Sequence, residues 1–200
     1  MNLILALDPF GHAVAARLRA ADPTALVHHV DDGTHPSLWP HADVIVLAAG
    51  RERLGLAEAV DRAAHAWRVP WFGVHPSAGE LRCGPVVIPG RTACHACYLR
   101  RREQHRTTEP DQVERRMPTG HPAHHVGVAA ALARQALAEA VDGPEPGAIG
   151  ATVRLFGQVD GATRTATVVA VDRCPRCRTR PVRDDELWPA FARISQESAS

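Results

Sequence analysis

Four of the five cysteines in the chain are arranged as two CxxC pairs. The first pair is Cys94 and Cys97, and the second is Cys174 and Cys177. Tetrahedral zinc is often bound by such pairs, because two thiolates three residues apart reach the same side of the ion. Two pairs together supply four thiolates and close the coordination shell, whereas a catalytic zinc keeps one position for water. The cysteines therefore predict a structural zinc site.

CxxC pairs have two other common uses, as thioredoxin-like redox motifs and as disulfides of secreted proteins. The redox interpretation is disfavoured because two pairs occur together and neither follows a tryptophan. The secreted interpretation is disfavoured because the chain begins with the short apolar run Leu3–Leu7 and not with a signal peptide. We therefore expect a cytoplasmic protein in a reducing compartment, where thiolates are available for metal.

Charge and hydropathy exclude several further classes of function. The 23 basic and 22 acidic residues give a net charge of +1, so composition offers no reason to expect a nucleic-acid partner. No window approaches the roughly 18 uninterrupted apolar residues of a membrane span. All basic residues other than histidine are arginines, and the missing lysines exclude Schiff-base chemistry and a P-loop lysine.

The elements that must position the cysteines alternate between strands and helices in the first half of the chain. This alternation predicts a mostly parallel sheet with flanking helices. The expected strands are Leu3–Leu7, Ala25–Val30, Asp43–Ala48 and Pro70–Val74, and the expected helices are Gly11–Ala21 and Leu56–Trp67.

The second half of the chain does not continue the alternation of strands and helices. Each CxxC pair adjoins one of its elements. The turn residues Asp160 and Gly161 predict a hairpin that runs into the second pair. Residues 107–122 are polar and proline-rich and are expected to form a crossover loop. The other expected elements are a hairpin or meander over Glu80–Gly90, helices over Cys97–Arg106 and Ala123–Val141, strands over Ala151–Gln158 and Ala162–Val171, and a tail over 181–200 that is a short helix or disordered.

A basic stripe follows the first CxxC pair on the predicted helix. It consists of Arg100, Arg101 and Arg102, with Arg106 one helical turn further on. Such a stripe could bind an acidic leader peptide or the acidic surface of a partner enzyme. The alternative is a solvated helix face whose arginines pair with Glu103 and with carboxylates elsewhere in the chain.

Cys83 is the cysteine outside the two pairs. It could act as a thioester-forming nucleophile, but it lies in an apolar stretch where cysteine is usually a small buried hydrophobe.

Histidines raise two further questions. His121, His124 and His125 form a local cluster that could bind a second metal or supply a general base, or could be ordinary residues at a helix start. His95 lies inside the first CxxC pair and could compete as a ligand, although four cysteines already complete the site.

The flanks of the two pairs resemble a known family. The resemblance is carried by the stretch from Gly84 through Pro89-Gly90 to Cys94 and Cys97, and by the late Cys174-Pro175-Arg176-Cys177. It is a resemblance to the ThiF-like (ubiquitin-activating-type) cyclodehydratase partner proteins, which are the leader-binding components of thiazole/oxazole-modified microcin biosynthesis. The resemblance implies an α/β protein whose degenerate ThiF-like Rossmann-type sheet with flanking helices spans residues 1–180. It also implies a four-cysteine zinc-knuckle subdomain and often a homodimer.

Two departures from that family bear on function. Active ThiF-like enzymes carry a glycine-rich loop after the first strand, where backbone N–H groups hold ATP phosphates. Here Asp8-Pro9-Phe10-Gly11-His12 stands in that place, so ATP is not expected to bind. Family members also begin with a winged-helix leader-recognition domain, and this chain begins directly at the first strand. Leader recognition is therefore expected from a separate protein or from another surface of this chain.

These observations lead to a function that is expected and to two alternatives. The expected function is a non-catalytic partner that scaffolds a YcaO-type cyclodehydratase during azoline formation on a ribosomally made peptide. The first alternative is an ATP-dependent adenylating enzyme of the ThiF-like type. The second is a zinc-stabilised partner of another peptide-modifying enzyme, such as a dehydratase. The expected partners are the modifying enzyme and the precursor peptide, with no nucleic acid and no membrane.

Overall fold

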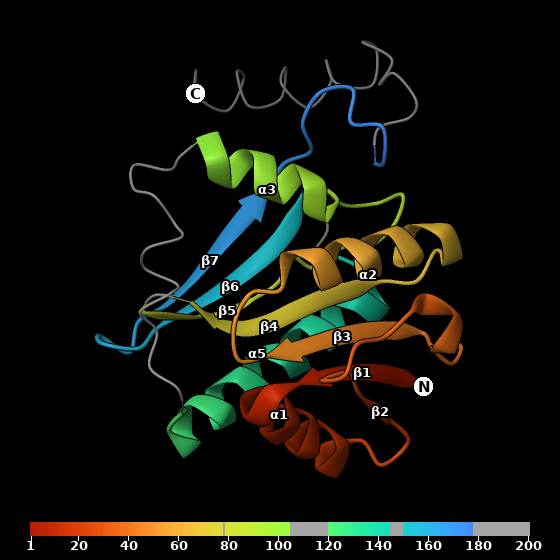
Figure 1. Ribbon diagram of the computed structural model, residues 1–200. Coiled ribbons are helices and arrows are strands. Elements are labelled where there is room, and N and C mark those ends of the chain that lie inside the picture. The colour runs from red at the N-terminus through yellow and green to blue at the C-terminus, as the bar shows by residue number, and fades with distance from the viewer. Residues whose placement is uncertain (78, 105–119, 145–149, 178–200) are drawn as a thin grey trace.

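The computed structural model describes residues 1–77, 79–104, 120–144 and 150–177. Over these residues the chain forms a seven-stranded sheet with the strand order β2-β1-β3-β4-β5-β6-β7 (Figure 1). Each strand predicted from the sequence is present, with its ends shifted by a few residues. The strands are β1 (Asn2–Leu7), β2 (Leu26–His29), β3 (Val44–Ala49), β4 (Trp71–Ser77), β5 (Glu80–Cys83), β6 (Ala151–Gly157) and β7 (Thr163–Val168).

The first four strands form the parallel part of the sheet. β3 is buried along its whole length, which explains why its sequence is apolar almost throughout. The helices that follow β1 and β3 lie on opposite faces of the sheet (Figure 1). The helices of the described residues are α1 (Asp8–Ala21), α2 (Leu54–Trp67), α3 (His95–Gln104) and α5 (Ala123–Asp142), with a short 3₁₀ turn at Pro36–Leu38.

The last three strands form the antiparallel part of the sheet, in the half of the chain where the sequence predicted a hairpin or meander over Glu80–Gly90 and a hairpin before the second CxxC pair. Over the described residues three strand pairs are parallel and three are antiparallel, because β5, β6 and β7 each run opposite to the preceding neighbour in the sheet. Tight turns join β4 to β5 and β6 to β7, whereas β6 follows β5 only after α3 and α5. The predicted turn at Asp160-Gly161 is present, with Gly161 at a φ of 68° and the Asp160 side chain accepting a hydrogen bond from the N–H of Ala162.

The helices divide the core into separate apolar clusters on the two faces of the sheet. α1 and α5 cover one face, where Phe10, Val14 and Leu18 of α1 meet the alternate residues of β1, β3 and β4. α2 covers the other face through Val60 and its alanines. A third cluster lies between α3 and the β6–β7 hairpin, and it contains three of the paired cysteines. The CxxC pairs therefore have an apolar core of their own.

Some sequence predictions fall outside the described residues. These are Arg106, most of the 107–122 loop and the tail over 181–200, and the boundary of the predicted domain at residue 180 stays a prediction with them. None of the helices in the described part of the chain combines the length and the apolar composition that a bilayer crossing requires.

Candidate metal centre and neighbouring polar sites

The two CxxC pairs come together although 80 residues separate them. Cys94 Sγ lies 3.7 Å from Cys97 Sγ and 3.6 Å from Cys174 Sγ, and Cys97 Sγ lies 3.5 Å from Cys177 Sγ. All four sulfur atoms lie within 4.8 Å of one another. None of the four is in a disulfide, and three of them are buried. This cluster is compatible with a metal site of four thiolates.

Backbone N–H groups stabilise negative charge on the cysteine sulfurs. The N–H of Val171 donates to Cys97 Sγ at 3.3 Å. Although burial opposes ionisation of Cys174, backbone N–H groups of Cys177 and Arg176 lower its pKa to about 7. A hydrogen bond with the Cys177 side chain and burial raise the pKa of the Cys94 thiol, and repulsion between the two neighbouring thiolates adds to the rise. A cation among the four sulfurs would offset that repulsion.

A buried carboxylate attaches the second CxxC pair to α2. Asp61 of α2 has no exposed side-chain surface and accepts a hydrogen bond from Arg176 at 2.5 Å, and it accepts another from Trp71 Nε1 at 2.9 Å. The same guanidinium binds both carboxylate oxygens of Glu58, at 2.7 and 3.2 Å. The N–H of His95 also donates to Asp61, at 3.3 Å. Asp61 thus contacts residues of both CxxC segments.

The basic stripe is divided in the structure. Arg102 binds the nearly buried carboxylate of Glu52 at 2.6 Å and lies over the ring of Tyr98. Arg101 donates instead to the carbonyl of Val169 and to the amide oxygen of Gln104. Arg100 is exposed. Of Arg100, Arg101 and Arg102, therefore, Arg102 is the one paired with a described carboxylate. This pairing is what the interpretation as a solvated helix face expects.

A groove lies between α3 and the face of the β5–β7 strands. Its volume is about 770 Å³. Arg82, Arg101 and Arg102 provide its basic side, and Val153 and Val168 are part of its apolar floor. The arginine stripe therefore borders a cavity large enough for several side chains.

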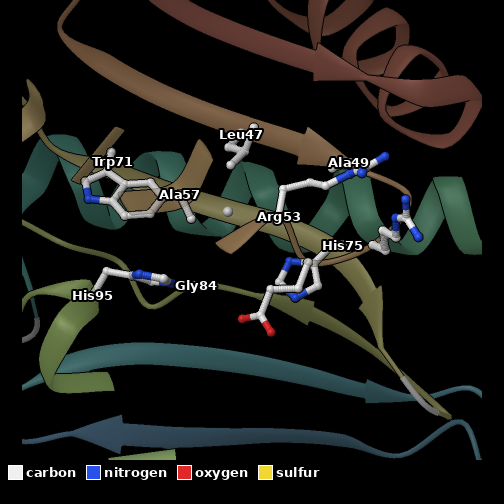
Figure 2. Close-up of a pocket in the computed structure, with 11 residues that line it drawn as sticks. Leu47, Ala49, Arg53, Ala57, Trp71, His75, Gly84 and His95 are labelled. Atoms are coloured by element: carbon white, nitrogen blue, oxygen red, sulfur yellow. The ribbon is translucent and has the colours of Figure 1, made fainter. Parts of the chain in front are cut away.

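A second, much smaller cavity is lined by residues of β3, β4 and α2 (Figure 2). His75, His95 and Gly84 are among its lining residues (Figure 2). Burial lowers the pKa of His75 to about 4 and also lowers the pKa of His95, so both rings are neutral at physiological pH. The cavity volume is about 20 Å³, which is enough for one water molecule and too small for a nucleotide or a peptide.

The carboxyl ends of β1 and β3 form the crevice in which doubly wound folds bind their ligands. The Asp8 carboxylate lies in it, where it accepts hydrogen bonds from the N–H groups of Gly50 at 2.7 Å and Gly11 at 3.3 Å. α1 also lies close to β3, since a Cβ on Gly11 would be 2.2 Å from the carbonyl oxygen of Ala48. A carboxylate thus occupies the place where a phosphate would meet the helix N-terminus.

The remaining sequence candidates are not brought together. Cys83 is fully buried in the core beneath α5, and burial raises its pKa to about 12, so it fits the interpretation as a small hydrophobe. His124 packs edge-on against His125, whereas His121 contacts Phe10 instead. Among the described residues these three histidines do not form a group with metal-binding geometry.

Sequence reasoning missed several polar residues of these sites. Asp61 and His75 are buried and Glu52 is nearly so, and no local pattern in the sequence pointed to the partner of any of the three. His12, His29 and Asp31 gather at one edge of the sheet. Their signal was available, because residues that follow the carboxyl ends of neighbouring parallel strands meet at the same edge.

Among known proteins, solved structures resemble this chain. No protein-family model matches the chain, and no curated protein matches it. The heterocyclase TruD superposes with a TM-score of 0.61 over 88% of this chain and 27% of its own, at 18% identity. Escherichia coli MccB gives a TM-score of 0.58 over 85% of this chain and 50% of its own, at 16% identity. The microcin C7 biosynthetic enzyme MccB in complex with N-formylated MccA gives 0.56 over 82% and 50%, also at 16% identity.

The chain has the ThiF-like fold. The prediction of an α/β ThiF-like sheet with flanking helices and clustered cysteines is therefore confirmed. The chain spans about a quarter of the length of TruD and half the length of MccB. At these identities the similarity establishes the fold, and function has to be argued from the sites of this chain.

Proposed function

We propose that this protein is a non-catalytic partner in the biosynthesis of a ribosomally made peptide natural product, where it supports a YcaO-type cyclodehydratase during azoline formation. The similarity of its fold to a heterocyclase and to a microcin biosynthetic enzyme supports this class of pathway. The observation that carries the non-catalytic role is the Asp8 carboxylate in the crevice between β1 and β3. Its negative charge repels phosphate, and no lysine is present to offset it.

The four cysteines would hold a structural zinc ion in this protein. Zinc–sulfur bonds of about 2.3 Å place the sulfurs of a tetrahedral site about 3.8 Å apart. Three of the separations between the sulfurs are 3.5 to 3.7 Å, which is close to that value. Such an ion would join the start of α3 to the end of the β6–β7 hairpin. Unoxidised cysteines also support a reducing, cytoplasmic location.

The groove beside α3 would bind the precursor peptide. Three arginines border it, and the described carboxylates beside them, Glu52 and Glu80, are each already paired with an arginine. An acidic peptide with apolar side chains therefore complements the basic side and the apolar floor. MccB has been solved in complex with N-formylated MccA, which supports peptide binding by this fold. Arg101 lines the groove and is paired with no described carboxylate, so it is the member of the stripe best placed for this contact.

Reconstitution tests the proposal. The YcaO-type protein encoded with this chain, ATP and the precursor peptide would be mixed with and without the chain, and azolines would be counted by mass spectrometry as lost water. We expect the chain to bind the YcaO-type protein and to accelerate azoline formation. Arg101→Glu should weaken peptide binding and slow the reaction. Arg17→Glu is the matched control, because Arg17 is an exposed arginine of α1 on the opposite face of the sheet.

Two results would contradict the proposal. The first is a pull-down that recovers no YcaO-type protein together with a rate that is indifferent to this chain. The second is equal loss of activity in the Arg101 and Arg17 variants, which would show that the groove does not bind the precursor peptide. The resemblance also implies a homodimer, and light scattering of the purified chain measures that separately.

The alternative function is an ATP-dependent adenylating enzyme. MccB has also been solved with ATP, so the fold itself is compatible with a nucleotide. ATP–pyrophosphate exchange separates the two functions, because an adenylating enzyme catalyses the exchange and a partner protein does not. We expect no exchange, since Asp8 fills the crevice of this chain.

A further inference from the structure

A cluster of metal-ligating side chains lies at the edge of the sheet, away from the four cysteines. His12 comes from the second turn of α1, His29 ends β2, and Asp31 follows β2. One ring nitrogen of each histidine and one oxygen of the carboxylate lie within 4.8 Å of one another. The chain brings them together because β1 and β2 are parallel neighbours, so the residues after their carboxyl ends meet.

The three side chains are held in place by contacts with one another and with the backbone. His12 Nε2 lies 2.7 Å from Asp31 Oδ2, and the His12 and His29 rings meet edge-on with their centres 4.5 Å apart. The other oxygen, Asp31 Oδ1, accepts the N–H of Asp8 at 2.8 Å. A hydrogen bond to the second carboxylate oxygen fixes the orientation of a metal-binding side chain, as it does around many metal sites.

We propose that His12, His29 and Asp31 form a second metal site, which binds a divalent transition-metal ion through two imidazole nitrogens and one carboxylate oxygen. Imidazole favours zinc, nickel, cobalt and copper, and a carboxylate completes a set of two nitrogens and one oxygen. The His12 and Asp31 side chains are 36% and 41% exposed, so water can complete the coordination shell. The site is thus open, in contrast to the closed cluster of four cysteines.

Cobalt titration of the zinc-loaded full chain tests this proposal. Co²⁺ bound to nitrogen and oxygen gives weak visible bands, whereas cobalt bound to thiolates gives intense charge-transfer bands. We expect one equivalent of Co²⁺ to bind with the weak bands alone. His29→Gln and Asp31→Asn should each weaken this binding about tenfold or more.

The chain offers a matched control next to the proposed ligand. His28 precedes His29 in β2 and faces the opposite side of the sheet, because side chains alternate along a strand. His28→Gln and His124→Gln should bind Co²⁺ as the unaltered chain does. Thermal unfolding of each variant shows that the fold is retained.

Several outcomes would overturn the proposal. One is unchanged Co²⁺ affinity in His29→Gln and Asp31→Asn, which would leave His12 and Asp31 as an ordinary ion pair. Another is an equal loss in His28→Gln. Absence of cobalt binding, or intense thiolate bands without the weak ones, would mean that His12, His29 and Asp31 hold no metal.

Discussion

The Asp8 carboxylate accepts a hydrogen bond of 2.7 Å from the backbone N–H of Gly50, and this bond joins the ends of β1 and β3. The strand order reverses at this point, because β2 lies beside β1 on one side and β4 lies beside β3 on the other. Folds of this type place their ligands at such a point. Here the Asp8 side chain takes up the N–H groups of Gly11 and Gly50 at this point, so these hydrogen bonds contribute to stability.

Removing the Asp8 carboxylate is expected to destabilise the fold. Asp8→Ala loses two hydrogen bonds to a charged acceptor, and we expect the free energy of unfolding to fall by about 1.5–3 kcal/mol. Asp8→Asn keeps an acceptor oxygen and tolerates the left-handed φ of 64°, so it should lose less. Urea unfolding measures both changes. Equal stability of Asp8→Ala and the unaltered chain would show that these bonds do not hold the crevice closed.

Close packing of α1 on β3 gives a second prediction. A Cβ on Gly11 would lie 2.2 Å from the backbone oxygen of Ala48, and backbone cannot move aside easily. We expect Gly11→Ala to cost about 3 kcal/mol or more in unfolding free energy. Gly55→Ala is the control, because a Cβ on Gly55 in α2 meets nothing within 4 Å. That change should be neutral or stabilise the chain by about 0.5 kcal/mol through helix propensity. Similar losses in both variants would contradict the packing argument.

The fold was more predictable from the sequence than the polar sites were. β3 was recognised because a run of apolar residues has one common cause, burial on both faces. The cysteine cluster was recognised because its spacing is chemically specific. Asp61 could not be recognised, because its partners Trp71 and Arg176 lie 10 and 115 residues away in the sequence. The antiparallel pairing of β6 with β7 was predicted from the turn at Asp160-Gly161, whereas β5 and β6 are separated in the sequence by α3 and α5, so their pairing had no local signal.

The paired cysteines and Cys83 should behave differently on substitution. Cys94→Ser or Cys177→Ser should lose bound zinc and the folded state together, because the metal-binding energy is part of the folding energy. Cys83→Ala is the control, since Cys83 lies in another core cluster and should keep stoichiometric zinc. Zinc content by atomic absorption and the Tm check these outcomes. Full zinc occupancy with an unchanged Tm in Cys94→Ser would rule out the four-thiolate site.

The ion pairs of Arg176 are expected to matter more than an exposed pair. Arg176→Gln leaves the buried Asp61 without its cationic partner, and we expect a loss of about 1.5–3 kcal/mol in unfolding free energy. Arg164 pairs with Glu80 on the surface and is 58% exposed, so Arg164→Gln should cost less than about 1 kcal/mol. Both variants should be compared by urea unfolding in the zinc-loaded state. Equal effects would indicate that Asp61 does not depend on Arg176.

His75 should make the protein less stable as pH falls. Burial lowers its pKa to about 4, although the facing carboxylate of Glu52 opposes that shift and the guanidiniums of Arg82 and Arg102 add to it. In the unfolded chain the pKa of histidine is about 6.5, so between these two values the unfolded state binds more protons and acid favours unfolding. The contribution is fully present above about pH 6.5 and decreases as pH falls toward 4.

His75→Gln isolates this contribution, because glutamine has a polar side chain but does not titrate. We expect the unaltered chain to lose about 1.4 kcal/mol more unfolding free energy than His75→Gln between about pH 8 and pH 5.5. Protonation of the thiolates also weakens metal binding in acid, but that effect is common to both proteins and cancels in the difference. Urea unfolding of both proteins at the two pH values measures it. Parallel losses in the two proteins would mean that His75 is protonated as readily in the folded state as in the unfolded one, against its burial.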